Sequence, residues 1–133
     1  MQQSNMNPGT AIPDDIRRFV LSRIPSVPHL EAILLMRNEA YQGWDGARLA
    51  RRLYLVEGAA QPVLEHLHAS GVLSRDDAGL YRFDPVDSEV AQLIDRLAVL
   101  YAHNLVGVTN LIHSETAKKA RRFADAFRWR KDS

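Results

Sequence analysis

Five histidines are the residues of this chain best suited to acid–base or metal chemistry, at positions 29, 66, 68, 103 and 113. None has a motif spacing with carboxylates that suggests a metal site, and His66 and His68, two apart on a predicted helix, point to different faces. The chain also has no cysteine, no glycine-rich phosphate loop and no nucleophile elbow. We therefore predict that the protein is not an enzyme and has no catalytic site, no metal site and no cofactor.

Phosphate binding by clustered cations is the second chemistry that the residues offer. Residues 1–114 carry 10 Lys+Arg against 13 Asp+Glu, whereas residues 115–133 carry 7 against 3, so the positive charge is concentrated near the C-terminus. A smaller group, Arg48, Arg51 and Arg52, is expected on the outside of a helix, either as a phosphate clamp or as a solvated face. The larger group is Lys118, Lys119, Arg121, Arg122, Arg128, Arg130 and Lys131. Because seven cations within fourteen residues exceed what solubility needs, this group favours an acidic partner.

Length and composition indicate one soluble globular domain. A chain of 133 residues can bury a core without disulfides, and its 46% apolar and 25% charged residues are close to the globular average. No apolar run approaches the roughly 20 residues that a membrane helix needs, and the N-terminus lacks the pattern of a secretory signal. We predict a cytoplasmic protein with no membrane partner.

Helix signals position the first half of the chain. Residues 1–12 are polar and lack periodicity, so they predict a flexible arm. Proline at position 13 suits the first turn of a helix that Pro25 ends, and a second helix starts near Pro28. Trp44 is expected in the core, and Asp45 is a good N-cap for the helix that carries Arg48, Arg51 and Arg52.

A further helix and a hairpin follow. The helix that begins near Glu57 has Ala60, Val63, Leu64 and Leu67 on its apolar side and ends at Gly71, a favourable C-cap. Residues 72–73 open a strand, residues 76–79 form a turn, and residues 80–83 return as a second strand.

Two helices are predicted after the hairpin. The first runs over residues 87–113 with a nearly continuous apolar stripe, interrupted by Asn104, that either forms a dimer interface or packs on the first two helices of its own chain. The residues expected at the interface are Leu93, Leu97, Leu100, Tyr101, Leu105 and Val108. The second, residues 115–133, is a basic amphipathic helix whose Phe123, Phe127 and Trp129 pack on the domain, stack on nucleotides or enter a partner's groove.

Residues 44–83 resemble the winged helix-turn-helix module of bacterial regulators such as the MarR and PadR families. Leu49-Ala50 and Leu53 match their Leu-Ala…Leu, and Leu64, Leu67 and Gly71-Val72-Leu73 match their Leu…Leu…Gly-Leu-Val. The helix after the hairpin is similar to the dimerisation helix of PadR-like proteins. The resemblance therefore implies a mainly α fold, residues 13–114 as a winged-helix domain, a homodimer and duplex DNA as the partner.

The expected DNA-reading surface departs from this pattern. The helix over residues 57–70 contains two Glu, two His and no Lys or Arg, and only Gln61 has a side chain that typically reads a base. The hairpin adds Arg75 and Arg82 but also Asp76 and Asp77. We predict DNA binding mainly through phosphates. The alternative is a protein-interaction adaptor, for example in the transcription machinery, that kept the fold and lost base reading. The predicted DNA-binding residues are Arg48, Arg51, Arg52, Gln61, Arg75, Arg82, Lys118, Lys119, Arg121 and Arg122.

Overall fold

The structure is a computed structural model that describes the backbone of residues 11–132 and the side chains of residues 11–126. The described chain is mainly α, with six helices and one small two-stranded antiparallel sheet. Residues 1–12 were predicted as a flexible arm, and the first ten of them lie outside the described residues. Contacts divide the chain into two compact units, which are considered separately: unit 1 holds residues 1–26 and 100–133, and unit 2 holds residues 27–99.

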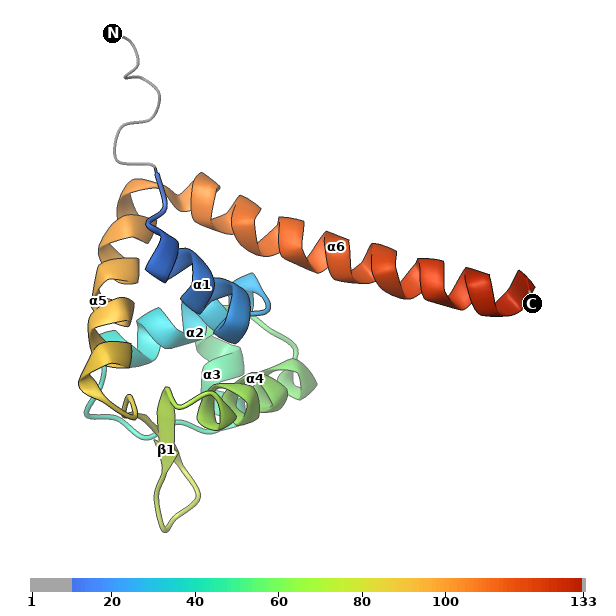
Figure 1. The fold of residues 1–133 in the computed structure, drawn as a ribbon. Coiled ribbons are helices and arrows are strands. Elements are labelled where there is room, and N and C mark those ends of the chain that lie inside the picture. The colour runs from blue at the N-terminus through green and yellow to red at the C-terminus, as the bar shows by residue number, and fades with distance from the viewer. Residues whose placement is uncertain (1–10, 133) are drawn as a thin grey trace, which may run out of the picture. The chain divides into compact units, whose positions relative to one another are not determined.

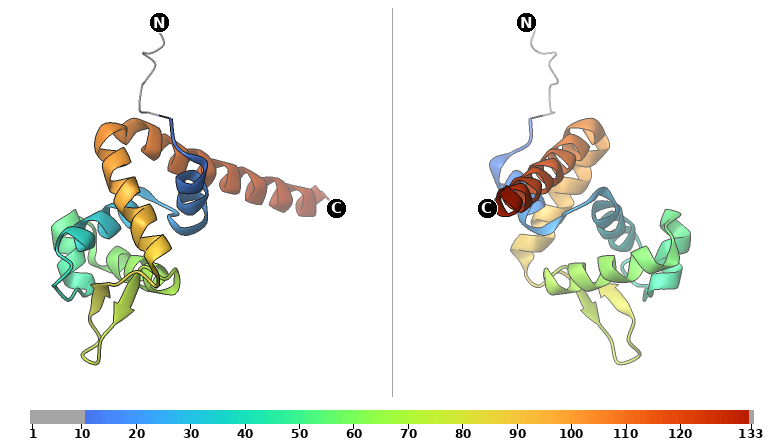
Figure 2. Two further views of the ribbon diagram at one scale, coloured as in Figure 1. Left: turned by 60° about the vertical axis from the view of Figure 1, so that its left-hand side comes forward. Right: turned by 90° about the vertical axis from the view of Figure 1, so that its right-hand side faces the viewer.

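Unit 2 contains three helices, a hairpin and most of a fourth helix (Figures 1 and 2). The elements in chain order are α2 (Val27–Asn38), α3 (Gly46–Leu53), α4 (Glu57–Ala69), β1 (Leu73–Arg75), β2 (Tyr81–Phe83) and α5 (Ser88–His103). The last turn of α5 belongs to unit 1. The hairpin projects away from α3 and α4 in the views shown.

The turn between α3 and α4 follows from local backbone chemistry. Asp45 caps α3, because its Oδ1 accepts from the backbone N–H of Arg48 at 2.9 Å, as the sequence predicted. Tyr54 ends α3 in the left-handed region with φ 58°, a conformation uncommon for a residue other than glycine. Three residues, 54–56, connect α3 to α4. Helix α4 buries the four side chains that the sequence predicted, Ala60, Val63, Leu64 and Leu67.

The predicted hairpin is confirmed, and its turn is organised by one carboxylate. Leu73 pairs with Phe83, and Arg75 with Tyr81, in antiparallel register. The Oδ1 atom of Asp76 accepts from the backbone N–H groups of Ala78 and Leu80, both at 2.9 Å. Gly79 has φ +86°, a conformation that suits glycine because a Cβ would be strained there.

Trp44 connects the hairpin to α3. Its backbone N–H and C=O both bond to Tyr81 at 2.8 Å, so one isolated bridge lies beside β2. The indole is fully buried, as the sequence predicted. The fully buried large side chains of unit 2 include Trp44, Leu30, Ile33, Met36, Leu49, Leu64, Leu67, Ile94, Leu97 and Val72.

Unit 1 pairs a short helix with a long one. Helix α1 (Asp14–Arg23) packs on the first half of α6 (Leu105–Asp132), and α6 continues well beyond it (Figure 1). The buried side chains of this unit are Ile16, Phe19, Val20, Ile24, Leu100, Val108 and Ile112. Every described residue from Thr116 to Ala126 is exposed.

The predicted C-terminal end of the helix over residues 87–113 is wrong. The helix breaks at Asn104, and the chain continues as a separate helix, α6. The Oδ1 atom of Asn104 accepts from the backbone N–H of Gly107 at 2.9 Å, which is an N-cap hydrogen bond. Gly107 makes room for this cap, since a Cβ there would collide with the amide of Asn104. The predicted boundary near Ser114 therefore lies inside α6.

The predicted dimer stripe is partly covered within the chain. Leu97, Leu100 and Val108 are at most 9% exposed, which favours the intrachain alternative for these three residues, and the dimer interface stays a prediction. Leu93 and Tyr101 are half-buried, and Leu105 is exposed.

We expect Asn104→Ala to lower the free energy of unfolding by about 1 kcal/mol, because the first turn of α6 loses its cap. The measurement is urea unfolding followed by circular dichroism. Asn110→Ala is the control: Asn110 is exposed inside α6, where alanine is the better helix former, so this variant should be equally or slightly more stable. Unchanged stability of Asn104→Ala would show that the cap does not stabilise the break.

Candidate nucleic-acid interface

The three arginines of α3 have different environments. Arg48 donates to Gln42, and its guanidinium lies 5.0 Å from the centre of the Trp44 ring. Arg52 donates to both carboxylate oxygens of Glu39, at 3.1 and 2.6 Å, and lies 5.5 Å from the same ring. Gln42 also donates to Glu39 at 2.8 Å, which closes a network around Trp44. Arg51, by contrast, is exposed and forms no ion pair with any described residue.

This network, Glu39, Gln42, Arg48 and Arg52 over Trp44, is called the Trp44 cluster below. The hydrogen bond from Arg52 lowers the pKa of Glu39 below its usual value, so the carboxylate stays ionised at neutral pH. Sequence reasoning missed the cluster. Its one local signal is the four-residue spacing from Trp44 to Arg48, because Glu39 and Gln42 precede the helix in a turn.

The other predicted DNA-binding residues of unit 2 also have partners within the chain. Gln61 on α4 is half-buried and donates to Glu65 at 3.1 Å. Arg75 donates to the carbonyl of Gly79 at 3.3 Å and lies 5.2 Å from the centre of the Tyr81 ring. These contacts hold both side chains against their own elements.

Arg82 is held most firmly, since it bonds both a carboxylate and a carbonyl. It donates to Asp76 at 3.0 Å and to the carbonyl oxygen of Tyr41 at 3.0 Å. Backbone hydrogen bonds, first from Leu80, together with Arg82, lower the pKa of Asp76. The predicted Arg82 and the acidic turn of the hairpin are therefore in contact with each other.

The predicted cations of α6 are exposed. Lys118, Lys119 and Arg121 form no ion pair with any described residue, and Arg122 approaches Glu115 only to 3.9 Å. Lys118, Arg121 and Arg122 line one shallow depression together with Asp125. The side chains of the remaining predicted residues of this tail, Phe127, Arg128, Trp129, Arg130 and Lys131, lie outside the described residues.

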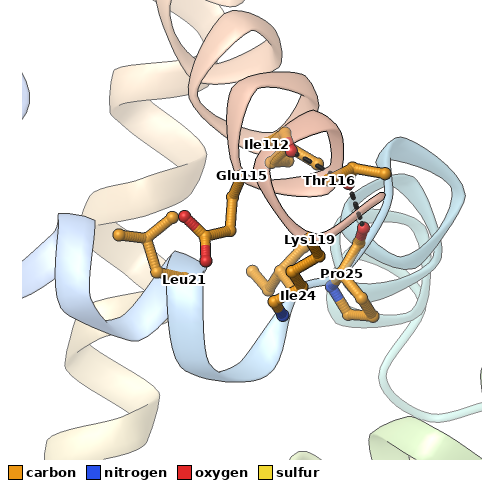
Figure 3. Close-up of a pocket in the computed structure, with 7 residues that line it drawn as sticks. All are labelled: Leu21, Ile24, Pro25, Ile112, Glu115, Thr116 and Lys119. Atoms are coloured by element: carbon orange, nitrogen blue, oxygen red, sulfur yellow. Dashed lines mark hydrogen bonds between the residues drawn. The ribbon is translucent and has the colours of Figure 1, made fainter. Parts of the chain in front are cut away.

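Lys119 lines a different hollow, on the side of α6 that faces α1. This groove, called the α1–α6 groove below, has a volume of about 170 Å³ and is lined by Leu21, Ile24, Pro25, Ile112, Glu115, Thr116 and Lys119 (Figure 3). The hydroxyl of Thr116 is shared between the carbonyls of Pro25 at 3.2 Å and Ile112 at 3.1 Å. Sequence reasoning missed the groove, because its two walls are about 90 residues apart along the chain.

The histidines give one contact that spacing did not predict. The rings of His29 on α2 and His66 on α4 meet edge to face, with centroids 4.9 Å apart. Burial, helped by repulsion from His66, lowers the pKa of His29 to about 4. Within the described residues, no three His, Asp or Glu side chains are grouped so that they could hold a metal ion. The His pair is therefore a packing contact that requires a neutral His29.

Comparison with known proteins identifies no relative: no family model, no curated protein and no solved structure matches the chain. Between residues 11 and 132, no single helix is long and apolar enough to cross a membrane.

We expect the stability of the protein to fall as the pH drops from about 6.5 to 4. The unfolded chain binds a proton on His29 near pH 6.5, but the folded chain resists it down to about pH 4, so unfolding takes up a proton across this window. The loss should be on the order of 2 kcal/mol after solvent screening. Urea midpoints measured from pH 7 to about 5, above the pH range where the carboxyl groups of the unfolded chain begin to bind protons, test this.

Two variants make the pH experiment specific. His29→Leu removes the titrating ring but keeps an apolar group, so its urea midpoint should depend less on pH than that of the wild type. His113→Gln, at an exposed position of α6, should retain the full pH dependence. Identical pH profiles for wild type and His29→Leu would contradict the assignment.

A second experiment separates structural from free arginines on α3. The double variant Arg48→Ala/Arg52→Ala should lower the urea midpoint, because it removes both guanidiniums from the Trp44 cluster and leaves Glu39 unpaired. Arg51→Ala is the matched control and should unfold at the wild-type midpoint. Equal effects of the two changes would mean that the cluster does not stabilise unit 2.

Proposed function

We propose that this protein is a non-enzymatic DNA-binding protein of the winged helix-turn-helix type that regulates transcription. The order α3, three-residue turn, α4, hairpin supports the winged-helix interpretation, and so does the backbone bridge from Trp44 to Tyr81, which adds a third extended segment beside the hairpin. Because one fold carries many functions, the side chains of the site decide what the protein binds.

The observation that carries DNA binding is the exposed cation group on α6. Lys118, Arg121 and Arg122 share one depression, and Lys118 and Arg121 have no partner among the described residues, so they are available to phosphates. On α3, Arg51 is the cation that remains available in the same sense. Arg48, Arg52, Arg75 and Arg82 are committed to contacts within the chain and contribute less to this proposal than their positions in the sequence suggest.

A homodimer belongs to the proposal. Leu105 and Val106, 54% and 66% exposed at the start of α6, offer apolar surface for a second copy. A dimer would present each cation twice on one duplex, which raises the number of phosphates neutralised and therefore the salt dependence of binding.

An adaptor that binds another protein is the second candidate. It is favoured by the surface of α4, which exposes Glu57, Gly58, Ala59, Pro62 and Glu65 and contains no Lys or Arg. Such a surface lacks the charge that dominates affinity for DNA. The two candidates differ in one measurable respect, because an adaptor need not bind duplex DNA at low salt.

The decisive measurement is binding of a 20-base-pair duplex over a range of salt concentrations. Arg121→Gln/Arg122→Gln should lower the slope of log affinity against log salt by about 3.6 in the proposed dimer, which loses four phosphate contacts at about 0.9 each. The matched control is Arg17→Gln/Arg18→Gln, an exposed tandem arginine pair on α1 with the same change in net charge. An equal decrease of the salt slope in both variants would indicate an effect of net charge alone. Absence of duplex binding at low salt would contradict the proposal.

A further inference from the structure

The α1–α6 groove has the lining expected of a docking site for an apolar side chain. Its floor and walls are apolar, formed by Leu21, Ile24, Pro25 and Ile112, and the hydroxyl of Thr116 is occupied by two carbonyls. A cavity of this kind near 150 Å³ accepts a benzene-sized group, so about 170 Å³ suits the side chain of a leucine or a phenylalanine. The groove therefore calls for a large apolar residue from its occupant.

The rim of the groove adds a charge requirement. Glu115 and Lys119 are its ionic residues, and Figure 3 shows Glu115 extending toward Leu21 and Lys119 lying beside Ile24. Glu115 is the partner of Arg122, whereas Lys119 forms no ion pair with any described residue. A carboxylate of an occupant that lay along α6 would meet Lys119 as its natural partner.

A second apolar contact lies farther along the same face of α6. Phe123 is four residues, about one helical turn, after Lys119, and its side chain is 73% exposed. Seven residues separate it from Thr116, so it lies about 10 Å along the helix from the groove. The face thus presents an apolar hollow, a cation and an aromatic ring in sequence.

We infer that this face docks an acidic amphipathic helix of another protein. The occupant inserts one apolar side chain into the α1–α6 groove, covers Phe123 with a second apolar residue seven positions away, and pairs a carboxylate between them with Lys119. The 10 Å separation of the two apolar contacts matches residues i and i+7 of a helix. This is the helix-in-groove mode of peptide recognition.

Charge argues against the other occupants of this face. Residues 115–126 carry four cations, Lys118, Lys119, Arg121 and Arg122, against Glu115 and Asp125, so a second copy of α6 would bring like charges together. A nucleic-acid backbone would set hydrated phosphates against the apolar lining of the groove. The cations Lys118, Arg121 and Arg122 line the other depression of α6, so the docking face and the proposed DNA-binding face use different side chains.

A displayed library of random 16-residue peptides, selected against the full chain, is the probe. We expect the enriched peptides to be net acidic, with two apolar residues seven positions apart. Synthetic copies should bind at least about tenfold more weakly to Lys119→Glu and to Phe123→Ser, the loss of one charge pair or one anchor. Lys118→Glu is the matched control for charge, at the neighbouring residue, and should bind within about twofold of the wild type.

Three outcomes would overturn the inference. They are enrichment no greater than on bare support, enriched peptides without acidic residues, and binding that is indifferent to Lys119→Glu and Phe123→Ser. Sedimentation of the unbound protein tests the other possible occupant, a second copy of this chain. If the protein is a dimer and Phe123→Ser dissociates it, the face belongs to a second copy instead. Lys118→Gln/Arg121→Gln separates this inference from DNA binding, because neither residue lines the α1–α6 groove or pairs with a residue that does. This variant should weaken binding of the duplex and spare the peptide, so either proposal can fail without the other.

Discussion

Unit 2 depends most on the burial of Trp44. Removing an indole from water buries about 150–250 Å², which at about 25 cal/mol per Å² stabilises the fold by about 4–6 kcal/mol. Its Nε1 finds no hydrogen-bond acceptor among the described residues, a cost of about 1–3 kcal/mol that the burial outweighs. The same residue pairs its backbone with Tyr81, precedes the N-cap of α3 and carries two guanidiniums near its ring. The hairpin and α3 are therefore linked through one residue, by its backbone on one side and by its ring on the other.

The Trp44 cluster changes how the arginines of α3 are interpreted. A sequence gives three cations on one helix, and periodicity correctly predicts that they avoid the core. It does not predict that Glu39 and Gln42 reach Arg52 and Arg48 from the preceding turn, because such contacts depend on how α2 approaches α3 in space. A guanidinium bonded to a carboxylate has its charge neutralised locally, so a phosphate must compete with that carboxylate. Arg51, one residue away, faces no such competition.

Local rules predicted most elements of the fold. The Asp45 cap, the four buried residues of α4 and the hairpin over residues 73–83 all followed from side-chain chemistry within a few residues. The break at Asn104 escaped the same rules because apolar residues continue at three-to-four spacing on both sides of it, and a stripe cannot distinguish a continuous helix from two helices. The distinguishing signal was Asn104 followed three positions later by Gly107, a cap beside the one residue that leaves it space. The α1–α6 groove had no local signal at all.

Helical geometry explains how α6 can support two separate contacts. At 100° per residue, Lys119 and Phe123 fall on the side that continues toward α1, whereas Lys118 and Arg121 fall on another. Lys119 lines the α1–α6 groove, whereas Lys118, Arg121 and Arg122 line the other hollow. The cations of the second side have few apolar neighbours, as suits phosphates that stay hydrated. Lys119 stands beside apolar walls, where a carboxylate on an apolar helix is better matched than a phosphate. Total charge therefore predicts only that α6 attracts acidic partners, and the residues beside each cation decide which partner each side of the helix fits.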